Sequence, residues 1–293
     1  MTPAHERRIG LTGSTGVLGA ALRRHAHGVQ WLPFDGDVRD SRSVHRWVNQ
    51  RGPFDAVIHC AAIVPTDLVD QQPHEAFRVN VGGTVHLLEA IRASRHAVRP
   101  WVCVISTSHV YGPSEVPLSE EAPLHPVSLY GMTKLQSEQW ALTYMEKYGL
   151  DVCVPRLFSY TDPCQASSYL VPAMMVRLTD VPPNGSLAVR GADDVRDFLG
   201  TEDVVAALTL LQERRARGVY NVGSGSGISV FDLVNRLREL LGRTDVTLER
   251  APAAGRTCLV ADTTRLRQLG WAPAVQCSEL LAAMVAGARA RTS

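Results

Sequence analysis

Apolar runs of strand length recur through the first half of the chain, separated by segments with helical spacing. These runs cover residues 8–12, 29–34, 56–62, 101–107 and 151–158. The run at 56–62 (AVIHCAA) is apolar almost throughout, as expected for a strand covered on both faces. Strands that alternate with crossover helices predict an α/β fold, a doubly wound parallel sheet of the Rossmann type.

The segments between these runs carry apolar residues at helical spacing. After Asp40 or Ser41, either of which can cap a helix, Val44, Trp47 and Val48 fall on one face of a helix that ends at about residue 50. Two later helices are predicted on the same ground, one with Phe77, Val81, Val85 and Leu88 on its apolar face, and one at 130–147 that Gly149 ends.

The regular alternation ends after residue 158. Residues 161–190 are rich in Pro, Ser and Gly, with one helical stretch at 171–178. A helix at 202–213 and a strand at 218–222 are placed to rejoin the sheet, and shorter helix, strand and helix units follow from Ser229. We therefore expect a second, smaller α/β domain built from the later part of the chain.

Composition and charge exclude several classes of protein. The 293 residues carry a net charge of +1, which gives no reason to expect nucleic acid or an anionic membrane as a general partner. The N-terminus lacks the apolar core of a signal peptide, and no apolar stretch is long enough for a spanning helix. The six cysteines include no CxxC pair, so no zinc site is predicted, and we expect Cys60, Cys103 and Cys153 to be buried thiols of a cytoplasmic protein.

A glycine-rich turn lies between the first strand and the first helix. Gly13, Gly16 and Gly19 form GxxGxxG, where the first permits a tight turn, the second lets backbone N–H groups approach a pyrophosphate, and the third lets helix and strand pack closely. An ordinary glycine-rich loop is the alternative, but the position at the first strand–helix junction favours a dinucleotide site. Asp35, near the end of the second strand, is either a ligand of the ribose hydroxyls of NAD or a turn residue, and no Arg or Lys stands at that strand end to bind a 2′-phosphate.

Tyr130 and Lys134 stand at i and i+4 in YGMTK and so share one face of the predicted helix. A free tyrosine has a pKa of about 10, which a nearby ammonium lowers toward neutrality, so that the phenol can exchange a proton. YxxxK alone usually marks a surface pair of helix residues. Here it follows the glycine turn and a strand end rich in Ser and Thr (ISTSHVYG, 105–112).

These motifs, in this order, resemble the extended short-chain dehydrogenase/reductase family over nearly the whole chain. The resemblance implies an NADP(H) or NAD(H) cofactor and a catalytic set of Tyr130, Lys134 and Thr107, the last polarising a substrate carbonyl. It places Asp37 at the adenine amino group and Asn80 beside the cofactor, although Asn80 also reads as a solvent-facing helix residue. The residues it assigns to the cofactor are Gly13, Ser14, Thr15, Gly16, Val17, Leu18, Gly19, Asp35, Asp37, Val38, Ala61, Ala62, Asn80, Ser106, Tyr130, Lys134 and Phe158.

The later half of the chain is similar to the nucleotide-sugar branch of that family. VRDFLGTEDVV (195–205) resembles the segment whose arginine, here Arg196, binds the diphosphate of a sugar nucleotide, and Arg256 matches a second such arginine. VYNVGSG (219–225) and LGW (269–271) also recur in that branch. The residues assigned to the substrate are Thr107, Ser108, His109, Tyr130, Ser159, Arg196 and Arg256. Ser159 departs from the pattern, because many relatives have an asparagine there.

The residues after Thr107 depart from the pattern of the 4,6-dehydratases, in which Asp-Glu follows the catalytic Thr. Ser108 and His109 stand in those places, so a dehydratase is disfavoured. His109 is either a proton donor or substrate ligand, or a histidine packed beside Tyr111. Chain length and the short link from the second strand to GDVRD favour a reductase of nucleotide-linked 4-keto-6-deoxyhexoses.

Three other functions stay open. A nucleotide-sugar 4-epimerase would use the same three catalytic residues, a reductase of non-sugar ketones would have less need of Arg196, and a non-catalytic NAD(P) sensor would commonly lose Tyr130 or Lys134. We expect residues 1–158 plus about 194–224 to form the dinucleotide-binding domain. Residues of about 159–193 and 225–293 would form the substrate-binding domain. The expected partner is a nucleotide-diphosphate sugar, and a homodimer is possible.

Overall fold

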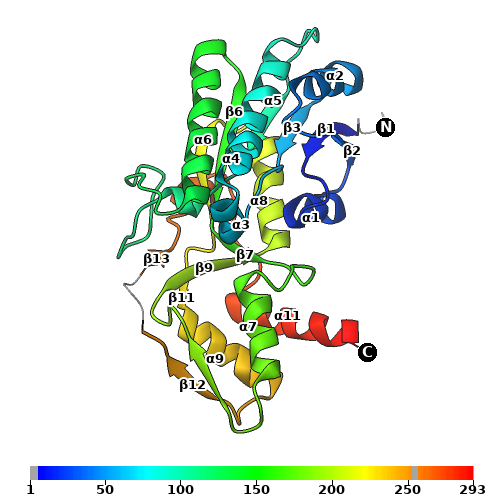
Figure 1. The fold of residues 1–293 in the computed structure, drawn as a ribbon. Coiled ribbons are helices and arrows are strands. Elements are labelled where there is room, and N and C mark those ends of the chain that lie inside the picture. Colours follow the sequence, from blue (N-terminus) through cyan, green and yellow to red (C-terminus); the bar gives the residue numbers. More distant parts are fainter. Residues whose placement is uncertain (1–5, 253–256, 293) are drawn as a thin grey trace. The chain divides into compact units, whose positions relative to one another are not determined.

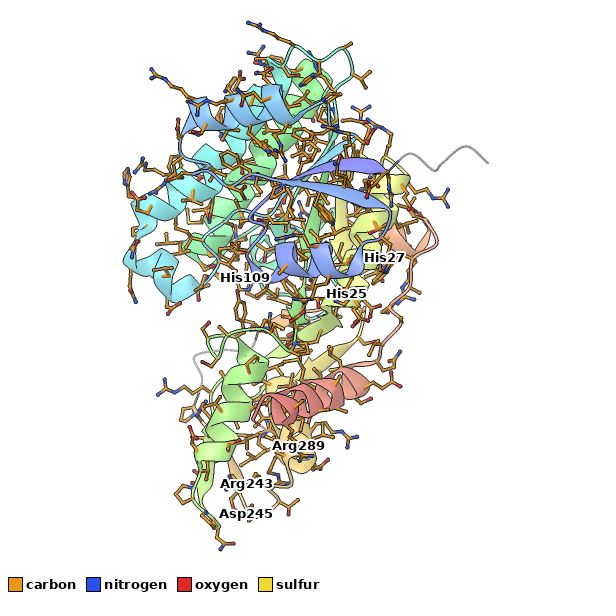
Figure 2. All side chains as sticks on the ribbon, turned by 90° about the vertical axis from the view of Figure 1, so that its right-hand side faces the viewer. His25, His27, His109, Arg243, Asp245 and Arg289 are labelled. Carbon is orange, nitrogen blue, oxygen red and sulfur yellow. The ribbon has the colours of Figure 1, made fainter. Side chains whose placement is uncertain are left out.

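The computed structural model describes residues 6–252 and 257–292. The chain divides into two compact units (Figure 1). The first unit comprises Met1–Gly112, Ala122–Leu157 and Val205–Asn221, and the second comprises Pro113–Glu121, Phe158–Val204 and Val222–Ser293. Residues 113–121 and 194–204 therefore group with the second unit, which differs from the boundaries expected from the sequence. The side chains of both units are drawn in Figure 2.

The first unit is built on a sheet with the strand order β10-β6-β4-β3-β1-β2, and β5 pairs with β6 at one end. The pairs around β1, β3, β4 and β6 are parallel, so the predicted Rossmann-type fold is confirmed. The strands are β1 (Arg7–Thr12), β2 (Val29–Pro33), β3 (Ala56–His59), β4 (Trp101–Val104), β5 (Ser106–Thr107), β6 (Asp151–Leu157) and β10 (Gly218–Val222). The single run predicted at 101–107 is interrupted at Ile105, which leaves β5 as a separate strand of two residues.

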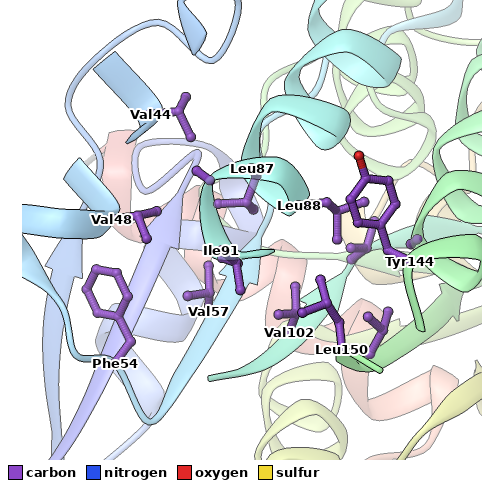
Figure 3. Close-up of a cluster of buried hydrophobic side chains, with 14 of the residues drawn as sticks. Val44, Val48, Phe54, Val57, Leu87, Leu88, Ile91, Val102, Tyr144 and Leu150 are labelled. Atoms are coloured by element: carbon purple, nitrogen blue, oxygen red, sulfur yellow. The ribbon is translucent and has the colours of Figure 1, made fainter. Parts of the chain in front are cut away.

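One face of this sheet is covered by α2 (Ser41–Arg51), α5 (Gly83–Arg92) and α6 (Leu129–Tyr148). Figure 3 shows how Val48, Leu88 and Tyr144 from the three helices pack with Val57 and Val102 of the strands. The predicted N-cap of α2 is confirmed, because the Asp40 side chain accepts a hydrogen bond from the Arg42 amide. Gly149 ends α6 in the left-handed conformation, with φ of 67°. The remaining helices of this unit are α1 (Val17–His25), α3 (Thr66–Gln71), α4 (Pro73–Ala76), the 3₁₀ turn η2 (Ser108–Val110) and most of α8 (Thr201–Glu213).

The helix predicted around residues 77–88 is not a continuous α-helix. A π-helical segment, η1 (Phe77–Gly82), lies between α4 and α5. A π turn contains more residues than an α turn, so it rotates the residues before it away from the face used by those after it. Val81 and Leu88 are buried as predicted, whereas the side chain of Phe77 is 48% exposed.

The second unit contains a sheet with the order β11-β9-β13, to which β7 adds by pairing with β9, and a separate β12-β8 pair. Its strands are β7 (Ser159–Thr161), β8 (Ser186–Val189), β9 (Val195–Gly200), β11 (Gly227–Ser229), β12 (Thr247–Arg250) and β13 (Cys258–Leu259). Its helices are α7 (Leu170–Asp180), α9 (Val230–Leu241), α10 (Thr264–Arg267) and α11 (Cys277–Thr292). Val171, Leu178, Leu233, Val234 and Leu281 form the centre of its core.

The end of α7 is held by a side chain from another part of this unit. The Arg243 guanidinium donates to the carbonyl oxygens of Leu178, Thr179 and Val181 and pairs with Asp245. Figure 2 labels Arg243 and Asp245 at this end of the unit. Carbonyls at a helix C-terminus have no partner within the helix, so the arginine supplies their donors. In the described ranges no helix is long and apolar enough to cross a membrane.

Candidate functional site

The glycine turn has the geometry expected of a phosphate cradle. Gly13 has φ of +67°, and a Cβ there would lie 2.6 Å from the Ala61 amide nitrogen. A Cβ on Gly19 would lie 2.2 Å from the Gly13 carbonyl oxygen, so α1 rests directly on the turn. At Gly16 the nearest of the neighbouring atoms to a Cβ would be 3.5 Å away, and the residue caps α1 without a side-chain hydrogen bond. Gly13 and Gly19 are thus required by packing, whereas a Cβ would fit at Gly16, which lies where an anion would meet the helix N-terminus.

The predicted cofactor residues around this turn differ in how far they are buried. Leu18 and Val38 are buried in the core, Ser14 is buried, and Thr15 is exposed. Val38 also packs on Gly83, where a Cβ would lie 2.7 Å from Val38 Cγ2. Burial of Leu18 and Val38 leaves their backbone as the part that a ligand at this edge would contact.

The two acidic residues after β2 differ in their surroundings. Asp35 is exposed, whereas Asp37 is held by Arg39, whose backbone amide and Nε both donate to Asp37 Oδ1 at 2.8 and 3.0 Å. This guanidinium lowers the pKa of the Asp37 carboxyl. Arg39 also pairs with Glu75, which in turn pairs with Arg78. Arg39 is therefore a cation near the end of β2, where the sequence analysis expected none, but the carboxylates of Asp37 and Glu75 neutralise it.

Asn80 is buried and is not the solvent-facing residue that its helical position would allow. Its Oδ1 accepts from the Ile63 amide at 2.7 Å, and its Nδ2 donates to the Ile63 carbonyl and to Thr133 Oγ1, both at 3.0 Å. Its own carbonyl accepts from the hydroxyls of Ser137 and Thr84. Asn80 thereby ties the segment after β3, which contains Ala61 and Ala62, to the helix that carries Tyr130.

His59, the last residue of β3, is buried between two hydroxyl groups. Its Nδ1 lies 2.7 Å from Thr12 Oγ1 and its Nε2 lies 3.2 Å from Thr84 Oγ1. Because the Thr84 hydroxyl donates to the Asn80 carbonyl, its oxygen accepts from Nε2–H, and Nδ1 accepts from Thr12. Burial, with a further contribution from the Lys134 charge, lowers the pKa of His59 to about 3.

Tyr130 and Lys134 lie one turn apart on α6, and both side chains are buried, with 8% and 5% exposed. The helix begins at Leu129 because the Ser128 hydroxyl caps it by accepting from the Gly131 amide at 3.1 Å. Burial lowers the pKa of Lys134 to about 8, against the opposing influence of Cys60 and Glu138. An ammonium with so low a pKa sits in a site where water is largely excluded, which strengthens its effect on a neighbouring phenol.

The residues that follow β4, in β5 and η2, lie at the carboxyl end of that strand. Thr107 and Ser108 are buried, and the Thr107 hydroxyl caps η2 by accepting from the His109 amide at 3.3 Å. His109 is exposed, and its ring meets the Tyr130 ring edge-on with centroids 5.6 Å apart. Figure 2 labels His109 in the first unit.

The predicted site residues from Phe158 onward belong to the second unit. Phe158 is buried, and its amide donates to the Val222 carbonyl at 2.9 Å, whereas Ser159 begins β7 and is partly exposed. Arg196, on β9, donates to the carbonyls of Val195 and Thr257 at 2.9 and 3.2 Å and pairs with Asp194. Burial lowers the pKa of Arg196. Arg256 lies outside the described residues.

The sequence analysis did not identify a buried network of polar side chains next to the predicted site. Glu138 lies two turns after Tyr130 on α6 and forms an ion pair with Arg156 of β6. The one signal available was the i, i+4, i+8 spacing of Tyr130, Lys134 and Glu138. The motif VYNVGSG, to which the sequence analysis gave no role, supplies Asn221 to the same network of side chains. Its Oδ1 accepts from the Tyr111 hydroxyl at 2.7 Å.

Comparison with known proteins decides the family. Residues 15–284 match the model of the GDP-mannose 4,6 dehydratase family. The chain belongs to this family. The resemblance to nucleotide-sugar enzymes of the extended short-chain dehydrogenase/reductase family is thereby confirmed. The relatives of this chain include dehydratases, epimerases and reductases that act on nucleotide sugars.

Individual relatives differ in how much of their length the chain covers. The chain is 35% identical to a dTDP-glucose 4,6-dehydratase of Streptomyces griseus over 259 residues, which are 86% of this chain and 75% of the relative. It is 29% identical to the GDP-6-deoxy-D-mannose reductase of Pseudomonas aeruginosa, over 95% of this chain and 96% of that one. The structure of RMD from Pseudomonas aeruginosa complexed with NADPH has a TM-score of 0.87 and 26% identity, over 97% and 99% of the two chains.

Proposed function

We propose that this protein is an NAD(P)H-dependent reductase that acts on the 4-keto group of a nucleotide-linked 6-deoxyhexose. The observation that carries this proposal is the segment after Thr107, where Ser108 and His109 occupy the positions of the acid pair of the dehydratases. Ser108 is buried and His109 lies against Tyr130, so this segment offers no carboxylate to remove a proton from a sugar carbon or to expel water. The near-complete mutual coverage with a GDP-6-deoxy-D-mannose reductase supports the same choice.

The residues of the glycine turn fit a dinucleotide. A ligand phosphate would accept hydrogen bonds from the first amides of α1, and the absence of a side chain at Gly16 leaves room for its approach. Asp35 is exposed at the end of β2, where it can accept hydrogen bonds from ribose hydroxyls. The reduced nicotinamide, when bound, would supply the hydride that adds to the ketone carbon.

The protein's own residues would complete the reduction to an alcohol. Tyr130 donates its phenolic proton to the carbonyl oxygen as that oxygen gains negative charge. The Thr107 hydroxyl donates a hydrogen bond to the same oxygen and so polarises the carbonyl. Lys134, one turn after Tyr130, stabilises the phenolate that remains until solvent returns the proton.

Recognition of the diphosphate of the nucleotide sugar is assigned to arginines of the second unit. Arg196 would bind the diphosphate, because a guanidinium donates paired hydrogen bonds that match phosphate oxygens. Arg256 would be a second ligand of the same group. Ser108, His109 and Ser159 would contact the substrate.

A 4-epimerase is the alternative, because it would use Tyr130, Lys134 and Thr107 in the same way, and the curated relatives include UDP-glucose 4-epimerases. The two activities differ in what happens to the oxidised cofactor. A reductase releases it as a product in each cycle, whereas an epimerase returns the hydride to the opposite face of the sugar and keeps the cofactor bound.

The experiment that tests the proposal offers UDP-, dTDP- and GDP-linked 4-keto sugars to the purified protein with NADH and with NADPH. We expect the protein to purify mostly free of cofactor and to oxidise one equivalent of NADH or NADPH per keto sugar. Both cofactor absorbance and sugar products are followed. Stoichiometric retained NAD, with interconversion of hydroxyl epimers and no added cofactor, would establish the epimerase instead.

A further inference from the structure

The segment that carries Thr107 is short and has little backbone support of its own. It consists of β5, with two residues, and the single turn η2, Ser108–Val110. A two-residue strand forms few ladder hydrogen bonds, so side-chain contacts must contribute to holding it in place. The structure provides such contacts at both ends of residues 106–111.

At the first end, Ser106 is held by the helix that carries Tyr130. The Ser106 hydroxyl donates to Glu138 Oε2 at 3.0 Å. Ser106 and Arg156 are register partners on β5 and β6, so their side chains emerge side by side on one face of the sheet. Glu138 reaches this face from α6 and contacts both of them.

At the second end, Tyr111 is held by its hydroxyl group. The hydroxyl accepts from Arg156 Nη1 at 2.8 Å and donates to Asn221 Oδ1 at 2.7 Å. The Arg156 guanidinium also lies over the Tyr111 ring, 4.8 Å from its centroid. Tyr111 is 2% exposed and Asn221 is fully buried, so water does not compete for these bonds.

One ion pair joins the two ends. Arg156 Nε donates to Glu138 Oε2 at 3.1 Å, and a second, shorter bond joins Arg156 Nη2 to Glu138 Oε1. The side chains are 3% and 1% exposed. A buried ion pair seldom stabilises a fold more than apolar residues of the same volume would, so its value lies in fixing one arrangement of the groups it joins.

We propose that Glu138, Arg156, Tyr111 and Asn221 are positioning residues that clamp the segment 106–111 and so set the Thr107 hydroxyl relative to Tyr130. The clamp fixes the segment at Ser106 and at Tyr111, and Thr107 and His109 lie between these two points. The catalytic consequence rests on the proposed function, whereas the effect on the segment itself does not. A hydroxyl displaced by about 1 Å no longer meets the reacting oxygen, and such displacements lower turnover by up to about 100-fold.

The test compares two Tyr→Phe variants within the first unit. Tyr111→Phe removes the hydroxyl that bonds Arg156 and Asn221. Tyr144→Phe, the matched control, removes a hydroxyl on α6 that donates to Glu89, far from the segment along the helix. Both side chains are buried, with 2% and 4% exposed, so each variant removes one hydroxyl from a buried ring. The Tyr111 hydroxyl bonds Arg156 and Asn221, whereas the Tyr144 hydroxyl bonds Glu89. Asn221→Ala removes the acceptor from the other side of the same bond and serves as the second variant.

Amide hydrogen exchange of residues 106–111 gives a readout that does not depend on activity. We expect exchange there to rise at least about tenfold in Tyr111→Phe and Asn221→Ala and to stay unchanged in Tyr144→Phe. With the keto sugar that the wild type reduces, Tyr111→Phe should lower kcat about 10- to 100-fold while the Kd of the cofactor stays within twofold. Turnover that falls equally in Tyr144→Phe, or stays near wild type in Tyr111→Phe, overturns the positioning role.

Failure of the proposed function has a different signature. If the wild type reduces none of the keto sugars, the reductase assignment fails, and hydrogen exchange alone decides the clamp. Unchanged exchange of 106–111 in both Tyr111→Phe and Asn221→Ala would then show that these residues do not hold the segment.

Discussion

Acid should destabilise this protein through His59 in particular. The ring is buried and neutral, its Nε2–H donates to Thr84, and its Nδ1 accepts from the Thr12 hydroxyl, which in turn accepts from the Ala61 amide. A second proton on the ring would face the Thr12 hydroxyl proton and would add a buried positive charge close to Lys134. The unfolded chain has none of these obstacles, so it takes up the proton more readily.

The magnitude follows from the two pKa values. Burial lowers the folded-state pKa of His59 to about 3 from the ordinary value of 6.5. Between these values the unfolded state binds one proton more than the folded state, so the free energy of unfolding falls as pH falls, by about 1.4 kcal/mol per pH unit. From pH 7 to pH 5 the loss amounts to about 2 kcal/mol, and it continues toward pH 3.

Urea unfolding of the wild type and of His59→Gln between pH 4 and pH 8 measures this contribution. Other groups titrate too, so the quantity of interest is the difference in pH dependence between the two proteins. Glutamine keeps a donor and an acceptor but does not titrate, so its free energy of unfolding should fall about 2 kcal/mol less from pH 7 to pH 5. Parallel pH dependences for the two proteins would refute the reasoning, because His59 would then bind protons equally in both states.

Three further predictions concern the site. Tyr130→Phe should lower turnover at least about 100-fold and leave cofactor affinity near normal, because the phenol supplies a proton in the transition state; turnover within threefold of wild type removes Tyr130 from that role. Gly16→Ala should fold normally, since a Cβ there would come no closer than 3.5 Å to its neighbours. It should nevertheless weaken NAD(P)H binding at least about tenfold in a fluorescence titration, and unchanged affinity would place the phosphates elsewhere. Arg196→Ala should weaken binding of a free nucleoside diphosphate by about 1.5–3 kcal/mol in calorimetry with little effect on NAD(P)H, and equal affinity for the diphosphate would count against the sugar-nucleotide assignment.

Local signals predicted the features that depend on local chemistry. Asp40 caps α2 and Gly149 ends α6 because a cap or a left-handed residue acts within one turn of its own position. The apolar runs form the central strands, as predicted, because a strand covered on both faces has apolar residues at nearly every position. The glycine turn was predictable from its spacing, although atoms of Ala61, in the segment after β3, exclude a side chain at Gly13.

Features that depend on register were not predictable. Glu138 and Arg156 are 18 residues apart, and nothing in the spacing of either shows that the helix and the strand bring them together. Val195–Gly200 was interpreted only as a ligand-binding segment, because Arg196 and Asp197 obscure the alternation of a strand. The pairing of Arg39 with Glu75, in addition to Asp37, likewise depends on where the loop after β2 meets α4.

The π-helical segment at Phe77–Gly82 makes the length of this stretch as important as its composition. In it, the Asn80 side chain holds Ile63, and its carbonyl takes hydroxyls from Thr84 and from Ser137 of α6. Deleting one residue here would let the stretch close into an ordinary α-helix and would remove the wider turn to which Asn80 belongs. Asn80 would then lose its position beside Ile63 and Thr133, although no apolar residue had been lost. Homologues that keep this site should therefore vary in the exposed side chains of the stretch and seldom in its number of residues.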